Sequence, residues 1–139
     1  MNAPSRVKAF DPAMLRKAGH VTFANVAEGF DAVLAGDTAR ALAAGKEALP
    51  LVFVARDAPR LAAFRETVAF FAPGHDFLSL PAWDCLPYDR VSPAPEILSE
   101  RLSTLAKLAA GGFKGPTILG TTVNALMQRV PTRDWIASQ

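Results

Sequence analysis

Cysteine is nearly absent from this chain of 139 residues, in which Cys85 is the only thiol. A single cysteine cannot form a disulfide within the chain, and it cannot supply the cysteine cluster of a structural zinc site. Histidine is scarce too, with two residues, so we expect no metal centre built from His and Cys ligands. This cysteine usage is typical of proteins in a reducing compartment, and we expect a cytoplasmic location.

Long apolar runs and runs of like charge are also lacking. Although half of the residues are hydrophobic, no stretch approaches the roughly 18 apolar residues that a membrane helix needs, so we expect no membrane partner. Fifteen basic residues nearly balance thirteen acidic ones, and the net charge is +2. Because the basic residues do not cluster, the charge pattern does not by itself indicate a DNA-binding face.

Short apolar runs alternate along the chain with patterns of helical period. We predict strands over residues 20–26, 51–55, 77–80 and 117–122, and helices over 30–45, 58–72, 95–110 and 123–130. Strands that alternate with helices indicate an α/β fold with a mostly parallel sheet and helices on its faces. We expect residues 1–19 to be an N-terminal lead segment and residues 20–139 to form one domain.

The loop after the first predicted strand lies where a nucleotide-binding α/β protein carries its phosphate loop. Such a loop needs glycines, a lysine and a Ser or Thr hydroxyl in fixed order. Here Gly29 lacks that lysine and hydroxyl, and Glu28 and Asp31 place negative charge where phosphates would bind. We therefore expect a degenerate phosphate loop, no bound cofactor and no catalytic residue in this chain.

The segment LPAWDCLPYDRVSPAPE, residues 80–96, contains four prolines and two large aromatic rings, which is typical of an ordered loop. Trp83 and Tyr88 have two possible roles, base stacking or packing against the domain, and packing is favoured. Asp84 and Asp89 could form a carboxylate pair for acid–base or Mg²⁺ chemistry. Hydrogen bonds from Asp84 to nearby backbone amides, and a local pair between Asp89 and Arg90, are the stronger alternative.

Three motifs occur in order in and after this loop: W-D-x-L-P-Y-D-x-x-S-P, E-I-x-S-x-R-L-x-T-L and T-V-N-A-L-M-Q-R-V-P. Together they resemble the N-terminal region of the bacterial transcription-repair coupling factor family, Mfd. The earlier run LVFVARDAPRLAAFRETVAFF fits that family more loosely. The resemblance covers roughly residues 20–136.

The resemblance implies a degenerate RecA-like lobe, similar to the first part of the excision helicase UvrB but without ATPase motifs. In the family, the ATP- and Mg²⁺-dependent motor and the regions that contact RNA polymerase and UvrA lie elsewhere in a longer chain. The resemblance therefore implies a piece of such a protein, with its remaining domains as direct partners and UvrA, RNA polymerase and DNA as indirect ones.

Two functions follow as hypotheses. The first is a non-catalytic structural and interaction domain that helps a UvrB-like module to recruit UvrA where RNA polymerase has stalled. Trp83, Asp84, Tyr88, Asp89 and Arg90 would then form a packing or interaction loop. The second is weak contact with single-stranded or duplex DNA through the region from Trp83 to Arg101, with Arg90 and Arg101 as the contacting cations.

Overall fold

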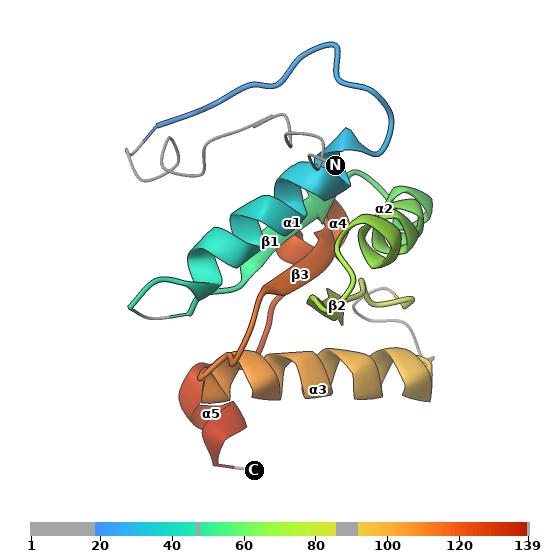
Figure 1. Ribbon diagram of the computed structural model, residues 1–139. Coiled ribbons are helices and arrows are strands. Elements are labelled where there is room, and N and C mark those ends of the chain that lie inside the picture. The colour runs from blue at the N-terminus through green and yellow to red at the C-terminus, as the bar shows by residue number, and fades with distance from the viewer. Residues whose placement is uncertain (1–18, 47, 86–91, 139) are drawn as a thin grey trace, which may run out of the picture.

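A three-stranded parallel sheet forms the centre of the molecule (Figure 1). The computed structural model describes residues 19–46, 48–85 and 92–138. The strands are β1 (Leu51–Ala55), β2 (Asp76–Leu80) and β3 (Thr117–Thr122), in the order β1-β3-β2. Leu119 of β3 is in register with Val52 of β1 and with Leu78 of β2. The predicted α/β class is confirmed, and the arrangement fits a partial RecA-like lobe.

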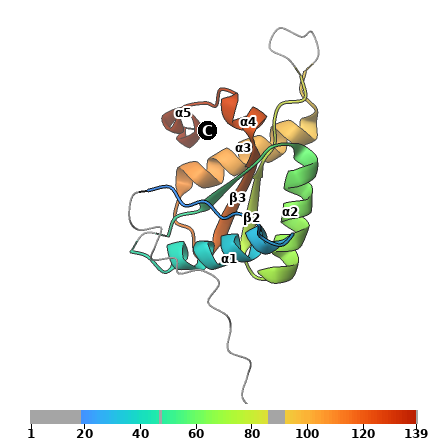
Figure 2. The same ribbon diagram turned by 90° about the horizontal axis from the view of Figure 1, so that it is seen from above.

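Two helices cover one face of the sheet: α1 (Phe30–Ala43) and α2 (Ala58–Phe71), beneath which the strands lie side by side in Figure 2. The side chain of Asp57 caps α2 by accepting a hydrogen bond from the backbone N of Arg60 at 2.9 Å. Small side chains on α1 allow close packing. The core on this face is formed by Ala32, Ala35, Ala39, Phe64, Val68, Ala72 and Ile118, with Leu51, Phe53 and Phe77 packed against it.

The opposite face is covered by α3 (Pro95–Ala110) and by α5 (Arg133–Ala137), which packs against α3. A second apolar core forms here from Leu78, Leu80, Leu105 and Leu119, with Leu108, Phe113 and Ile136 packed against it. Leu98 and Leu102 of α3 are exposed, because Arg101 and Thr104 occupy the face of α3 that meets the sheet. Among the described residues, no helix is long and apolar enough to cross a membrane.

The helix predicted over residues 123–130 is too long. In the structure, α4 (Val123–Met127) begins with Thr122 as its cap, and Gln128 already has extended backbone angles. Pro131 disfavours helical geometry in the residue before it, which explains part of the early end. The prediction also missed α5, whose first turn is capped by the Thr132 side chain.

The strand predicted over residues 20–26 is wrong, because residues 19–29 contain no strand in the structure. Val21, Phe23 and Val26 remain exposed, so their alternation with polar residues does not create a buried face. Asn25 has a φ of 54°, in the left-handed region, which interrupts an extended backbone. An apolar alternation forms a strand only when it pairs with another strand, and the sheet of the described residues consists of β1, β3 and β2 alone.

Every residue of β3 is buried, and Gly120 is the point of closest packing on this strand. A Cβ atom added to Gly120 would lie 2.8 Å from Phe77 Cε1 and 2.9 Å from Leu61 Cδ1. Gly120 therefore lets the rings and methyl groups of the α1 and α2 face close over the central strand.

Replacing Gly120 with Ala should destabilise the domain by about 1–3 kcal/mol, because the new methyl group overpacks this contact. Urea unfolding followed by circular dichroism measures the change. Gly115→Ala is the matched control, since a Cβ at Gly115 meets no atom within 4 Å, and its unfolding midpoint should hardly move. Equal midpoints for the two variants would contradict the packing argument.

Candidate functional site

A cluster of polar contacts joins the carboxyl end of β2 to α3 and to the segment after α4. It consists of Pro81, Trp83, Arg101 and Gln128, which we call the loop clamp. Arg101 is the centre of the clamp, and its side chain is 1% exposed. The carboxyl ends of parallel strands are where α/β proteins usually place ligands, but the clamp fills this position with the protein's own side chains.

The guanidinium group of Arg101 makes three contacts within the clamp. It lies over the Trp83 ring, with Cζ 4.4 Å from the ring centroid. Its Nη1 donates to the carbonyl oxygen of Pro81 and, at 3.4 Å, to Oε1 of Gln128. Burial lowers the pKa of Arg101, because the charged form loses hydration. Nε and Nη2 are buried and have no hydrogen-bond partner in the described part of the chain.

Gln128 is the second anchor of the clamp, and no local pattern in the sequence distinguishes it. Its Oε1 accepts a hydrogen bond from the backbone N of Trp83 at 2.8 Å, across 45 positions of sequence. The extended conformation that ends α4 lies at this same residue. Gln128 belongs to one of the three sequence motifs. A motif does not indicate a hydrogen-bond partner that lies 45 positions away.

Asp84 connects the two described ends of the proline-rich loop. Each of its carboxylate oxygens accepts a hydrogen bond from the backbone N of Ala94 at 3.3 Å. This bond to a backbone amide is the alternative that the sequence favoured for Asp84 over a catalytic pair. Tyr88, Asp89 and Arg90 lie outside the described residues, as do residues 1–18 of the predicted lead segment.

Two threonines extend the polar contacts along β2. Thr104 of α3 donates through Oγ1 to the carbonyl oxygen of Ser79 at 2.6 Å. Thr121 of β3 donates in the same way to Leu80 at 2.9 Å. These two bonds satisfy backbone carbonyls at the end of β2. Both hydroxyls are thereby used inside the fold.

Arg101, predicted as a possible surface contact for DNA or a partner, is instead placed in the interior. Helical periodicity alone does not reveal this, because the usual expectation for an arginine is a solvated position. A direct contact between its guanidinium group and DNA would first require the clamp to open. Trp83 is half-buried, and the described contacts place one face of its ring against Arg101.

The segment predicted to be a degenerate phosphate loop lies at the start of α1. Gly29 has a φ of 81° and precedes the helix, whereas Glu28 is exposed. Asp31 accepts a hydrogen bond from the backbone N of Ala32 at 3.0 Å and forms an ion pair with Arg60. A carboxylate of the chain itself thus occupies the first turn, where a bound phosphate would need free amides and positive charge.

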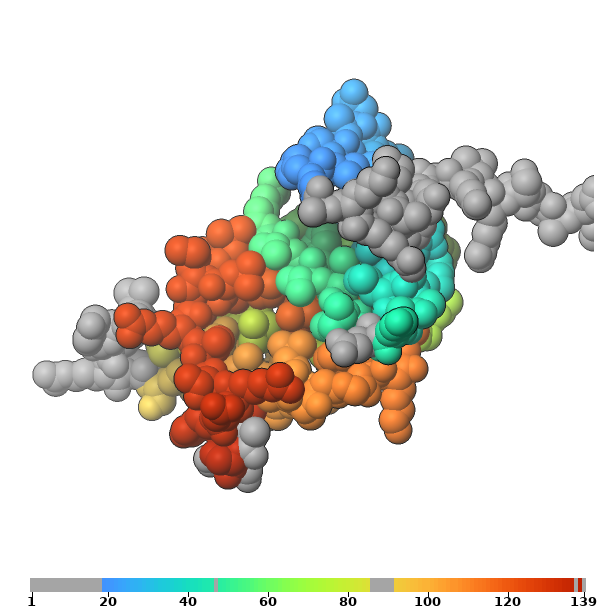
Figure 3. Space-filling view, turned by 90° about the vertical axis from the view of Figure 1, so that its left-hand side faces the viewer, coloured from blue at the N-terminus to red at the C-terminus, as the bar shows by residue number. Residues whose placement is uncertain are grey.

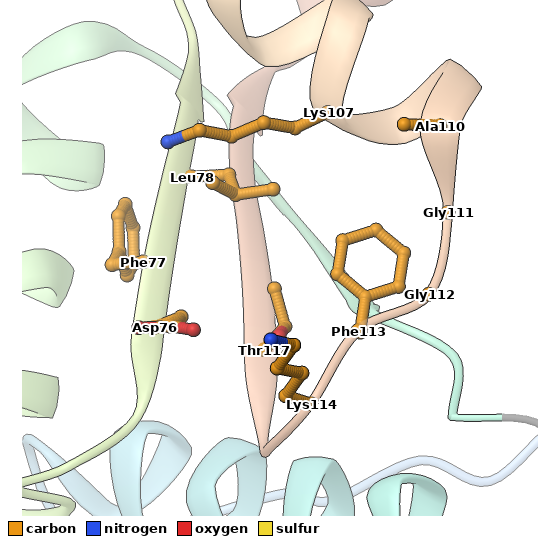
Figure 4. Close-up of a pocket in the computed structure, with 10 residues that line it drawn as sticks. All are labelled: Asp76, Phe77, Leu78, Lys107, Ala110, Gly111, Gly112, Phe113, Lys114 and Thr117. Carbon is orange, nitrogen blue, oxygen red and sulfur yellow. The ribbon is translucent and has the colours of Figure 1, made fainter.

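A shallow hollow of about 420 Å³ lies near the amino end of β2 (Figure 4). Lys107 of α3 reaches across it toward β2, and Phe113, Lys114 and Asp76 line its other sides. Two exposed lysines and one exposed carboxylate without a bonded framework do not define a catalytic site. In the described part of the chain, no three His, Cys, Asp or Glu side chains are grouped to hold a metal ion.

The parallel sheet, its helical layers and the clamp at its carboxyl edge define the class as an α/β domain similar to part of a RecA-like lobe. No protein-family model matches the sequence. Curated relatives are transcription-repair-coupling factors: the protein of Rickettsia bellii is 37% identical over 68 residues, and that of Escherichia coli K12 is 36% identical over 91 residues. The resemblance predicted from the motifs is confirmed.

These alignments are partial on both sides. The Rickettsia bellii match covers 49% of this chain and 6% of that relative, and the Escherichia coli match covers 63% and 7%. A third relative, from Rickettsia conorii, is 31% identical over 68 residues. The chain thus corresponds to a small part of the relatives it matches, and their whole-protein activities do not transfer to it directly.

Arg101→Lys should destabilise the domain by about 1–3 kcal/mol, because an ammonium group cannot both stack flat on Trp83 and donate to Pro81. Arg65→Lys is the matched control: Arg65 lies 5.7 Å from the Phe77 ring centroid but is exposed, so its loss should stay below about 0.5 kcal/mol. Urea unfolding measures the free energy of unfolding of both variants. If Arg101→Lys lost as little stability as Arg65→Lys, the clamp would contribute little to the stability of the domain.

A double-mutant cycle of Arg101→Lys with Trp83→Leu tests whether the two side chains act together. We expect a coupling free energy of about 0.5–2 kcal/mol, because each substitution removes the same flat stacking of the guanidinium group on the indole ring. Additive losses within about 0.3 kcal/mol would mean that the stacked geometry is not energetically coupled.

Proposed function

We propose that this chain is a non-catalytic structural and interaction domain of a transcription-repair coupling factor. In this role it forms part of a UvrB-like module that helps to recruit UvrA to lesions at which RNA polymerase has stalled. The partial homology to transcription-repair-coupling factors supports the general process. The assignment to a non-catalytic module rests on the two sites described above.

The observation that carries the proposal is the loop clamp. Trp83 lies in the proline-rich loop and Arg101 lies in α3. The two side chains contact each other and do not line a ligand cavity. Instead, Trp83, Arg101 and Gln128 bind one another and fix the carboxyl end of β2. A loop held in this way supports a rigid surface for neighbouring domains, because its conformation is set by the domain itself.

The start of α1 supports the absence of nucleotide chemistry. In the Asp31–Arg60 pair, Asp31 neutralises the charge of Arg60 and places a carboxylate at the start of the helix. Phosphates would have to displace this carboxylate without the lysine and hydroxyl that usually compensate them. ATP and Mg²⁺ would then be needed only by a motor elsewhere in a longer protein.

The proposal is tested by titrating the ¹⁵N-labelled chain with ATP–Mg²⁺, ADP, single-stranded DNA and duplex DNA at low salt. We expect no amide shifts beyond those of a buffer-matched blank. Shifts confined to residues 25–31 would mean that the degenerate loop still binds nucleotide. Shifts between Trp83 and Arg101 on adding DNA, lost in Arg90→Ala and weakened by salt, would replace the scaffold function with DNA binding.

A further inference from the structure

The hollow between α3 and the amino end of β2 has no part in the proposed function. Its volume is about 420 Å³, and it lies at the opposite end of β2 from the loop clamp (Figure 4). Ligand pockets in proteins begin at roughly 300 Å³. The hollow is therefore large enough to receive a side chain of another molecule.

Three charged side chains line the hollow, and none of them has a charged partner in the described part of the chain. Lys107 reaches across it from α3 toward β2, Lys114 lies near the start of β3, and Asp76 begins β2 (Figure 4). The ion pairs among the described residues are all formed by arginines. Two ammonium groups and one carboxylate leave one excess positive charge in the hollow. We therefore expect it to attract a ligand group with a single negative charge.

The turn after α3 adds hydrogen-bond donors beside this charge. Gly111 and Gly112 have φ angles of 64° and 68°, in the left-handed region that favours glycine. Both glycines are exposed, and the orange atoms of this part of the chain lie at the molecular surface in Figure 3. Among the described residues, no group accepts a hydrogen bond from the backbone N of Gly112, Phe113 or Lys114. A carboxylate has two acceptor oxygens, so it can use these amides together with a lysine.

Apolar side chains and Asp76 narrow the chemistry of the ligand. Phe113 is half-buried and packs against the core that contains Leu78, and both line the hollow. A ligand that carries an apolar group next to its charge would remove this surface from water. Asp76 repels groups of higher charge density, such as a phosphate dianion or the backbone of a nucleic acid. A carboxylate beside an apolar group fits these conditions best.

We propose that this hollow is a docking site for an acidic segment of a partner protein, in which a Glu or Asp residue lies next to an apolar residue. The carboxylate would accept hydrogen bonds from Lys107, Lys114 and the amides of residues 112–114. The apolar neighbour would cover the ring of Phe113. Because the site is separate from the loop clamp and from the start of α1, the proposal goes beyond the proposed function and does not depend on it.

A titration with N-acetyl-phenylalaninate tests the site, because this small molecule carries one carboxylate next to one apolar ring. It is added to the ¹⁵N-labelled 139-residue chain while the amide shifts of residues 111–114 are followed. N-acetyl-phenylalaninamide, which lacks the charge, is the control ligand. We expect saturable shifts with the carboxylate only.

The Lys114→Met variant should raise the Kd of the carboxylate by about threefold or more, as expected for the loss of an exposed charged contact. Lys46→Met is the matched control, since Lys46 is exposed and does not line the hollow, and it should leave the Kd unchanged. Asp76→Asn should make the same amides respond to inorganic phosphate, because the repelling carboxylate is gone. Circular dichroism checks that each variant is folded.

Three outcomes would overturn the proposal. One is an equal response, or no response, to the charged and uncharged ligands. Another is a Kd that Lys114→Met leaves unchanged. The third is inorganic phosphate that binds the unaltered chain as tightly as the carboxylate does, because a phosphate-bearing ligand would then replace the acidic segment. Since these titrations contain neither nucleotide nor DNA, failure of this site is distinguishable from failure of the proposed scaffold function.

Discussion

The central strand β3 imposes the constraint on which the rest of the fold depends. All six of its residues are buried, so both of its edges must be paired and both of its faces must be covered. The pairing comes from β1 and β2, and the cover comes from α1 and α2 on one face and α3 and α5 on the other. Gly120 has no side chain, so the side chains of Phe77 and Leu61 can approach the central strand closely.

The loop clamp shows how a polar group can hold a loop where a hydrophobic residue would only fill space. Burying Arg101 costs hydration, and a guanidinium group without a described carboxylate partner recovers only part of it through Trp83, Pro81 and Gln128. Its directional contacts fix the place where the chain leaves β2. Burial of Arg101 therefore lowers the free energy of unfolding but defines the surface at the carboxyl edge of the sheet.

Together, the start of α1 and the clamp support the interpretation of a RecA-like architecture that serves contacts between parts of a protein. At both positions where such a fold would carry ligand chemistry, side chains of the chain itself interact with one another.

Local patterns in the sequence were sufficient to predict β1, β2, β3, α1, α2 and α3, because each has a compact apolar run or a clear cap. The α/β class follows from their alternation. Tertiary structure alone decided that residues 20–26 form no strand, that Gln128 meets Trp83, and that Arg101 is buried. Periodicity records which side chains share a face of one element, whereas these outcomes depend on partners up to 45 positions away, which no local pattern contains.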